Sequence, residues 1–109
     1  MDRRLTTVDE VRKAQECFKI GDNHHKEKKF HEAIESFKKV VEINPFDEKH
    51  LKELQKKLKS GNYKLQQECM AYMGNAAVHL SGLIRELDDE QKEQVPVDEE
   101  LAEVFKDWE

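Results

Sequence analysis

The residue types that most often act as nucleophiles, bases and metal ligands gather in one short stretch, which holds Cys17, Asp22, His24, His25 and His31. Cys17 and His24 are seven residues apart, so that on one helix they could form a nucleophile–base pair. The favoured interpretation is that both are packing positions, because the sequence has no Gly-rich phosphate loop and no GxSxG or HExxH motif. We therefore predict that the protein is not an enzyme.

The same stretch gives little support to a metal site. Zinc ligands converge at spacings such as i and i+4 on one helix face. The adjacent His24 and His25 point in different directions, and no second ligand pair with regular spacing is present. Cys17 and Cys69 lie outside any CxxC motif, which favours two reduced thiols in a cytosolic protein over a disulfide or a metal site. We expect no metal and no cofactor, and a cytoplasmic location, with a nuclear one left open.

The composition describes a chain with a modest core and many charges. Of its 109 residues 37% are hydrophobic and 39% are charged, with a net charge of -5. One domain is expected at this length. There is no run of about 18 apolar residues and no apolar segment after the N-terminal charges, so neither a membrane span nor a secretory signal is expected. Four glycines and two prolines are too few for an all-β protein built on many turns.

Helical spacing of apolar residues runs through nearly the whole chain. A first helix is predicted to begin at Thr7, which forms an S/T-x-x-E capping box with Glu10, and to end in the lysine-rich stretch 26–29. A second helix is predicted over about 31–42. It must end near Asn44, because the following proline disfavours helical geometry in that residue.

Two more helices and a C-terminal segment follow. Asp47 is expected to cap a third helix that ends at Gly61, with this glycine as a left-handed C-cap. A fourth helix is predicted over about 63–87, with Gly74 and Gly82 as weak helix formers that interrupt it. Residues 88–97 are expected to be a charged linker.

The end of the chain is predicted to form a short fifth helix after Asp98. Its apolar residues Leu101, Val104, Phe105 and Trp108 share one face. Packing on its own fold as a cap is favoured over exposure to a partner, because a thin core needs every apolar anchor. The prediction is therefore an all-α chain of five helices, with a helical domain at 1–87 and an acidic linker and C-terminal helix at 88–109.

A repeat pattern joins the first two helices. It reads Cys17-x2-Ile20-Gly21-x2-His24, then Ala33-x3-Phe37, then Pro45. This spacing resembles that of one tetratricopeptide repeat, over residues 14–47. In physical terms, small Gly21 and Ala33 would lie where two antiparallel helices press together, and Phe37 would fill the space beside them.

The resemblance implies a right-handed helical array of antiparallel helix pairs. A single repeat cannot bury its own apolar face. Advancing by 34 residues finds no second copy of the pattern, so the third helix is interpreted as half a repeat or a capping helix. The long fourth helix is the expected cover, with another copy of the chain or a partner as the alternative.

The resemblance also implies a function: a non-enzymatic adaptor or scaffold that binds another protein or a peptide segment in a helical groove, as a co-chaperone-type or assembly factor. Family members that grip the acidic C-termini of heat-shock chaperones use a lysine and an asparagine where this chain has Phe18 and Asp22. That carboxylate clamp is therefore not expected. The predicted partner-binding residues are Phe18, Asp22, His25, Lys29, Lys52 and Lys56.

Two other hypotheses remain open. The apolar stripe of residues 65–87 could pair with its copy in a structural homo-oligomer. A three-helix MIT-type domain is a further possibility, which the helix stop at Asn44-Pro45 disfavours.

Charge is distributed unevenly along the chain. Residues 85–109 carry a net charge of -8, whereas residues 49–64 hold six lysines and one acid. A lysine-rich helix can bind nucleic acid. We do not expect this here, because no arginine interleaves with the lysines and a solvated helix face explains them as well. The acidic end could instead fold back onto this lysine face.

Overall fold

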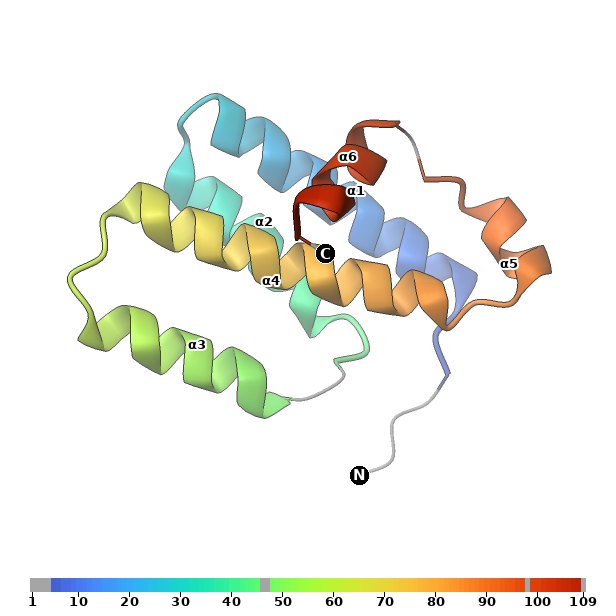
Figure 1. The fold of residues 1–109 in the computed structure, drawn as a ribbon, viewed down its shortest axis with the longest axis horizontal. Coiled ribbons are helices and arrows are strands. Elements are labelled where there is room, and N and C mark those ends of the chain that lie inside the picture. Colours follow the sequence, from blue (N-terminus) through green and yellow to red (C-terminus); the bar gives the residue numbers. More distant parts are fainter. Residues whose placement is uncertain (1–4, 46–47, 98, 109) are drawn as a thin grey trace.

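The computed structural model describes residues 5–45, 48–97 and 99–108 (Figure 1). Within these residues the chain forms six α-helices and no strand, which confirms the all-α class. The helices are α1 (Val8–Lys26), α2 (Phe30–Glu42), α3 (Glu48–Ser60), α4 (Leu65–Arg85), α5 (Asp89–Gln94) and α6 (Glu99–Trp108).

The first two helices begin and end where the sequence indicates. The Thr7 N–H donates to the Glu10 carboxylate at 3.0 Å, and the Glu10 N–H donates back to the Thr7 hydroxyl at 3.2 Å, which forms the predicted capping box. Lys28 makes the tight turn between α1 and α2 with a φ of 63°. Asn44, which follows the end of α2, has a φ of 43°. Asparagine tolerates this left-handed conformation better than most residues do.

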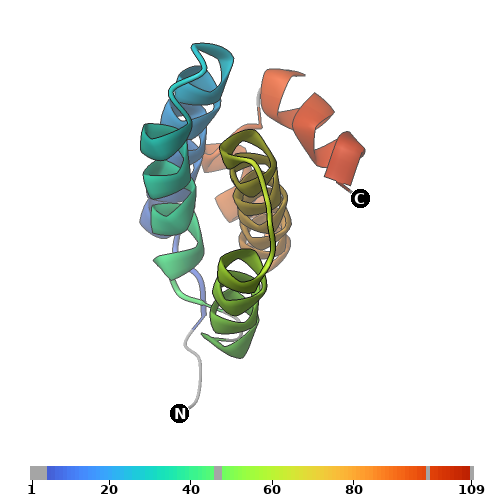
Figure 2. The same ribbon diagram turned by 90° about the vertical axis from the view of Figure 1, so that its left-hand side faces the viewer.

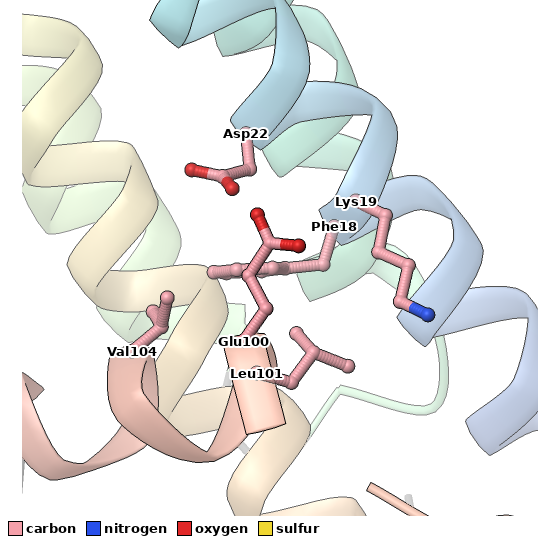
Figure 3. A pocket seen from close by; sticks show the side chains of 6 residues that line it. All are labelled: Phe18, Lys19, Asp22, Glu100, Leu101 and Val104. Carbon is pink, nitrogen blue, oxygen red and sulfur yellow. The ribbon is translucent and has the colours of Figure 1, made fainter. Parts of the chain in front are cut away.

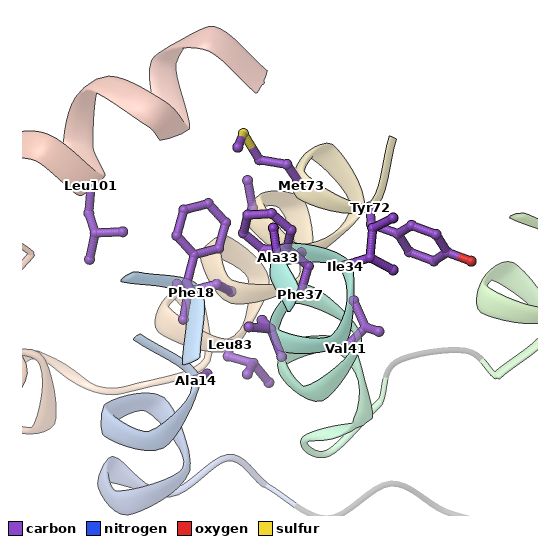
Figure 4. Close-up of a cluster of buried hydrophobic side chains, with 14 of the residues drawn as sticks. Ala14, Phe18, Ala33, Ile34, Phe37, Val41, Tyr72, Met73, Leu83 and Leu101 are labelled. Carbon is purple, nitrogen blue, oxygen red and sulfur yellow. The ribbon is translucent and has the colours of Figure 1, made fainter. Parts of the chain in front are cut away.

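The core lies where α1, α2 and α4 meet (Figure 4). Phe18 and Phe37 are fully buried, with ring centroids 5.3 Å apart. A Cβ on Gly21 would lie 2.7 Å from Phe37 Cε1, so only glycine lets α1 approach α2 this closely. The predicted small–large arrangement of the repeat is therefore confirmed.

Helix α4 supplies the cover that a single repeat needs. It packs along α2 and α1, and its buried residues are Cys69, Tyr72, Met73, Gly74, Ala76, Ala77, His79, Leu80 and Leu83. The buried His79 donates from Nε2 to the Ile43 carbonyl at 2.7 Å, which joins α4 to the end of α2. Although Gly74 and Gly82 were expected to interrupt it, α4 is continuous because tertiary packing outweighs their low helix propensity.

A polar cluster ties three chain segments together near the N-terminus. The Thr6 hydroxyl donates to the Glu86 carboxylate, and Asn44 Nδ2 donates to the Thr6 hydroxyl at 3.1 Å. Thr6 is 4% exposed, so these hydrogen bonds satisfy a buried polar group. The segment before α1 is thereby fixed to the ends of α2 and α4.

Two local predictions are wrong, and two fall outside the described residues. Gly61 does not have a positive φ; its N–H donates to the Lys57 carbonyl at 3.2 Å, which continues the α-helical pattern instead of a left-handed cap. The expected linker contains α5, so the described residues hold six helices instead of five. Asp88 and Gln91 form a capping box at its start, a signal that the sequence analysis missed. The caps predicted at Asp47 and Asp98 lie outside the described residues.

Three layers are visible from the side (Figure 2). The α1–α2 pair forms the first, α4 with α3 the second, and α6 lies on the far side of α4. Helix α3 is peripheral, with Leu58 buried and Leu51 and Leu54 partly buried against the core. None of the described helices is long and apolar enough to cross a membrane.

Candidate functional site

Helix α6 packs mainly on α4 (Figures 1 and 2), and residues of its N-terminal half also reach the adjacent side of α1. On α1 the residues involved are Phe18, Lys19, Asp22 and Lys26, and three of these are spaced by four residues, which places them on one side of the helix. We call these four residues the α6-covered face. The repeat pattern therefore contributes both to the core, through Gly21, and to an outer face that another helix occupies.

The apolar part of this contact joins Phe18 to α6. Leu101 is 3% exposed, and together with Val104 and Glu100 it faces Phe18, Lys19 and Asp22 (Figure 3). The space left between the two helices is about 10 Å³, room for about one water molecule. A cavity of this size does not hold a substrate or a cofactor, so it is a helix–helix seam.

The polar part of the contact is a shared lysine. Lys26 Nζ lies 3.2 Å from Asp22 Oδ2 and also donates to the Glu100 carboxylate. Figure 3 shows the carboxylates of Asp22 and Glu100 directed into the same space. Hydrogen bonds to Glu100 and then to Asp22 raise the pKa of Lys26, so the ammonium stays charged between two acids. Lys26 and Glu100 are both more than half exposed, so solvent screens their pair.

The predicted binding residues on α1 have different environments. Phe18 is fully buried beneath α6, so it does not reach the surface while α6 is in place. Asp22 is 14% exposed and paired with Lys26. His25 Nδ1 lies 3.3 Å from Cys69 Sγ, and its ring centroid lies 5.7 Å from that of Phe30.

The predicted lysines do not join the α1 residues in one surface. Lys29 lies just after α1 and pairs with Glu27 at 3.2 Å. Lys52 and Lys56 are exposed on α3, which lies on the other side of α4 from α6 (Figure 1). As half a repeat, the third helix would follow the α1–α2 pair and bring these lysines beside the α1 residues. In the structure α4 packs against the α1–α2 pair instead.

The cysteine–histidine contact is a packing contact. Cys69 is fully buried, and burial raises the pKa of its thiol to about 11. The thiol is therefore protonated at neutral pH and is a poor nucleophile. Cys17 is also a free thiol and is partly buried. Within the part of the chain that the structure describes, no three His, Cys, Asp or Glu side chains are grouped so that they could hold a metal ion.

The stripe of α4 that the homo-oligomer hypothesis would use faces its own chain. Cys69, Met73 and Leu80 are buried against α1 and α2. The large apolar residues of α4 that are exposed are Met70 at 39% and Val78 at 58%. These two are eight residues apart and do not form a continuous seam by themselves.

The comparisons with known proteins agree with the repeat pattern. Residues 14–47 match the tetratricopeptide repeat family, a span that covers most of α1 and all of α2. No curated protein and no solved structure matches the chain. Repeats of this kind are typical of protein–protein interaction modules.

Sequence reasoning missed three residues that the structure places at the α6-covered face or against it. Lys26 was assigned only to the end of a helix, and Glu100 was counted only as part of an acidic segment. Leu101 was placed on the apolar side of the last helix, which is correct, but its contact with Phe18 was not predicted. The i, i+4 spacing of Asp22 and Lys26 was the available signal.

Proposed function

We propose that this chain is a non-enzymatic interaction module, an adaptor or scaffold that binds a segment of another protein on its α1 side. The observation that carries the proposal is the tetratricopeptide repeat at residues 14–47, packed as a close helix pair. The pair exposes charged side chains around a large aromatic residue, Phe18, that lies beneath α6. Aromatic residues with a charged rim are common at protein interfaces.

The residues proposed to contact the partner are those expected from the sequence. Asp22, His25 and Lys29 follow one another along the C-terminal part of α1 and the turn after it. Phe18 is proposed to contact the partner only when α6 has moved away from it. Lys52 and Lys56 form a separate exposed cationic area on α3, which suits an acidic stretch of a partner but not the same stretch that contacts α1.

More specifically, we propose that the protein is a co-chaperone-type adaptor or an assembly factor in the cytoplasm or the nucleus. Two free thiols suit a reducing compartment. Binding of chaperone C-terminal carboxylates is not part of the proposal. The positions that such a clamp would use hold a buried phenylalanine and an aspartate already paired with Lys26.

The proposal is tested by affinity capture from a cell extract with charge-reversed variants. Asp22→Lys alters the α1 side and Lys52→Glu alters α3. Lys39→Glu is the matched control, at an exposed position of α2. We expect the original chain and the Lys39→Glu control to capture a protein that Asp22→Lys or Lys52→Glu loses. Circular dichroism first shows that each variant is folded. Identical capture by all four chains would contradict the assignment.

A further inference from the structure

Helix α6 covers a surface with the features of a binding site. Phe18 is fully buried beneath Leu101 and Val104 of α6, and the charged residues Lys19, Asp22 and Lys26 surround it. Without α6, the part of the Phe18 ring that faces Leu101 and Val104 would contact solvent. A buried aromatic anchor inside a charged rim is the arrangement that carries most binding energy at protein interfaces.

The chain after α4 is held by a small set of apolar side chains, and α6 packs on α4 with Val104 and Phe105 partly buried. Leu87, Val95 and Leu101 are each 3% exposed, whereas α5 buries none of its own residues. Arg12 Nη2 donates to the Gln94 carbonyl at 3.2 Å, and Lys26 pairs with Glu100. Both polar contacts are exposed, so salt screens the ion pair.

Detachment of α6 is therefore a small opening compared with global unfolding. Helix α6 has ten residues, too few to be stable in water without a packing partner. Its docking and its folding are coupled for this reason. Phe18 belongs both to the α1–α2–α4 core and to the contact with α6, but core contacts such as that of Gly21 with Phe37 do not involve α6 and remain when α6 leaves.

The chemistry of α6 defines what the face accepts. One side of the helix presents Leu101, Val104 and Phe105, at positions i, i+3 and i+4. Within Glu99–Trp108 there are four acids, Glu99, Glu100, Glu103 and Asp107, against Lys106. The carboxylate of Glu100, directly before the first apolar residue, binds Lys26. The occupant is thus an acidic amphipathic helix.

We propose that α6 is an intramolecular occupant of the α6-covered face, and that an acidic amphipathic helix of a partner protein binds there in its place. The inference rests on the proposed function and adds to it the chemistry of the partner segment and its control by α6. The partner helix matches the i, i+3, i+4 apolar pattern and carries a carboxylate for Lys26. The tethered α6 sets the concentration of partner that is needed to open the face.

The test uses a fluorescent synthetic peptide with the sequence of residues 98–109 as the probe. In the 109-residue chain, Leu101→Asp removes the apolar anchor of α6 and leaves the sequences of α1 and α4 unchanged. The matched control, Lys106→Asp, adds an acid on the exposed side of α6. A short tether holds α6 at an effective concentration of the order of millimolar, so we expect Leu101→Asp to bind the peptide at least about tenfold more tightly than the original chain. Lys106→Asp should bind it as weakly as the original chain does.

A second measurement needs no substitution. Hydrogen exchange of the original chain should show α6 amides exchanging much faster than those of α1 and α4, and faster still when excess unlabelled peptide is added. Equal peptide binding by the original chain and a folded Leu101→Asp variant would overturn the inference, as would α6 amides as protected as those of α4. Peptide binding together with dimerisation of the original chain in light scattering would assign the face to a second copy and overturn the proposal of a partner protein.

Failure here is distinguishable from failure of the proposed function. The Lys52→Glu arm of the capture experiment concerns α3, away from the α6-covered face, so it does not depend on the release of α6. If it succeeds while the peptide fails to bind, the interaction module stands and the inference about α6 is wrong.

Discussion

Substitution of Gly21 by alanine measures how closely α1 and α2 approach each other. The added methyl group would lie 2.7 Å from Phe37 Cε1 and 2.9 Å from Cδ1. Carbon atoms pack at about 3.5–4.0 Å, so the ring or the helix must move by about 1 Å. Phe37 has no exposed area, and the ring of Phe18 lies against it with centroids 5.3 Å apart. The ring therefore has no open space to enter.

Two opposing effects determine the sign of the change. Alanine is favoured over glycine in a helix by about 1 kcal/mol. Forcing an extra methyl group into a packed core costs about 1–3 kcal/mol. We expect Gly21→Ala to lower the free energy of unfolding by about 1 kcal/mol. For a domain of this length such a change lowers the melting temperature by about 4–8 °C.

The assay is urea and thermal unfolding followed by circular dichroism, on four chains of a double-mutant cycle. Phe37→Leu alone leaves a cavity and costs about 1–2 kcal/mol. In that background Gly21→Ala places its methyl group in vacated space and should raise stability, which gives a coupling energy of about 2 kcal/mol. If Gly21→Ala stabilises the original chain by about 1 kcal/mol and shows no coupling to position 37, Gly21 does not pack directly against the Phe37 ring.

Three further predictions concern a cap and the two thiols. Thr7→Ala removes the capping box of α1 and should lower the free energy of unfolding in urea by about 1 kcal/mol, whereas Asp88→Ala at α5, which buries none of its residues, should change it by less than about 0.5 kcal/mol; equal losses would contradict the different burial of the two helices. In the native protein an aromatic disulfide reagent should modify the partly buried Cys17 first and reach Cys69 only on unfolding, and simultaneous labelling would show that Cys69 is accessible. Burial raises the pKa of Cys69 from 9.0 to about 11, so the folded state holds this proton more tightly than the unfolded state does. Its contribution to stability is complete below about pH 9 and is lost as the pH rises toward 11, by up to about 2–3 kcal/mol. Unfolding measured across this range should show a smaller loss in Cys69→Ala, and equal losses in the two chains would refute the assignment.

The helix boundaries that rest on local chemistry were predictable. The Thr7–Glu10 capping box and the stop before Pro45 depend on residues within a few positions of each other, so the sequence contains all the information needed. The left-handed cap at Gly61 failed, because glycine permits that conformation without requiring it. The sequence analysis did not predict α5, because the many charges of residues 88–97 suggest a linker. The Asp88–Gln91 capping box is the local signal for this helix.

The candidate site was only partly predictable. Asp22 and His25 follow from the repeat pattern, which places them on α1. Which face α6 occupies does not follow from it, since the contact of Leu101 with Phe18 joins residues more than eighty positions apart. The lysines of α3 do not join the α1 residues, because α4 and not the third helix packs on the α1–α2 pair.

The sequence by itself determined an all-α chain, the α1–α2 pair and the close contact of Gly21 with Phe37, because helix periodicity, caps and the repeat spacing are local or nearly local properties. The tertiary structure alone decided that α4, and not α3, packs on that pair, and that α6 lies over Phe18 with Glu100 paired to Lys26. An amphipathic helix specifies that one face must be buried, but several apolar surfaces can satisfy that requirement. Which surface does so depends on how all the helices pack together.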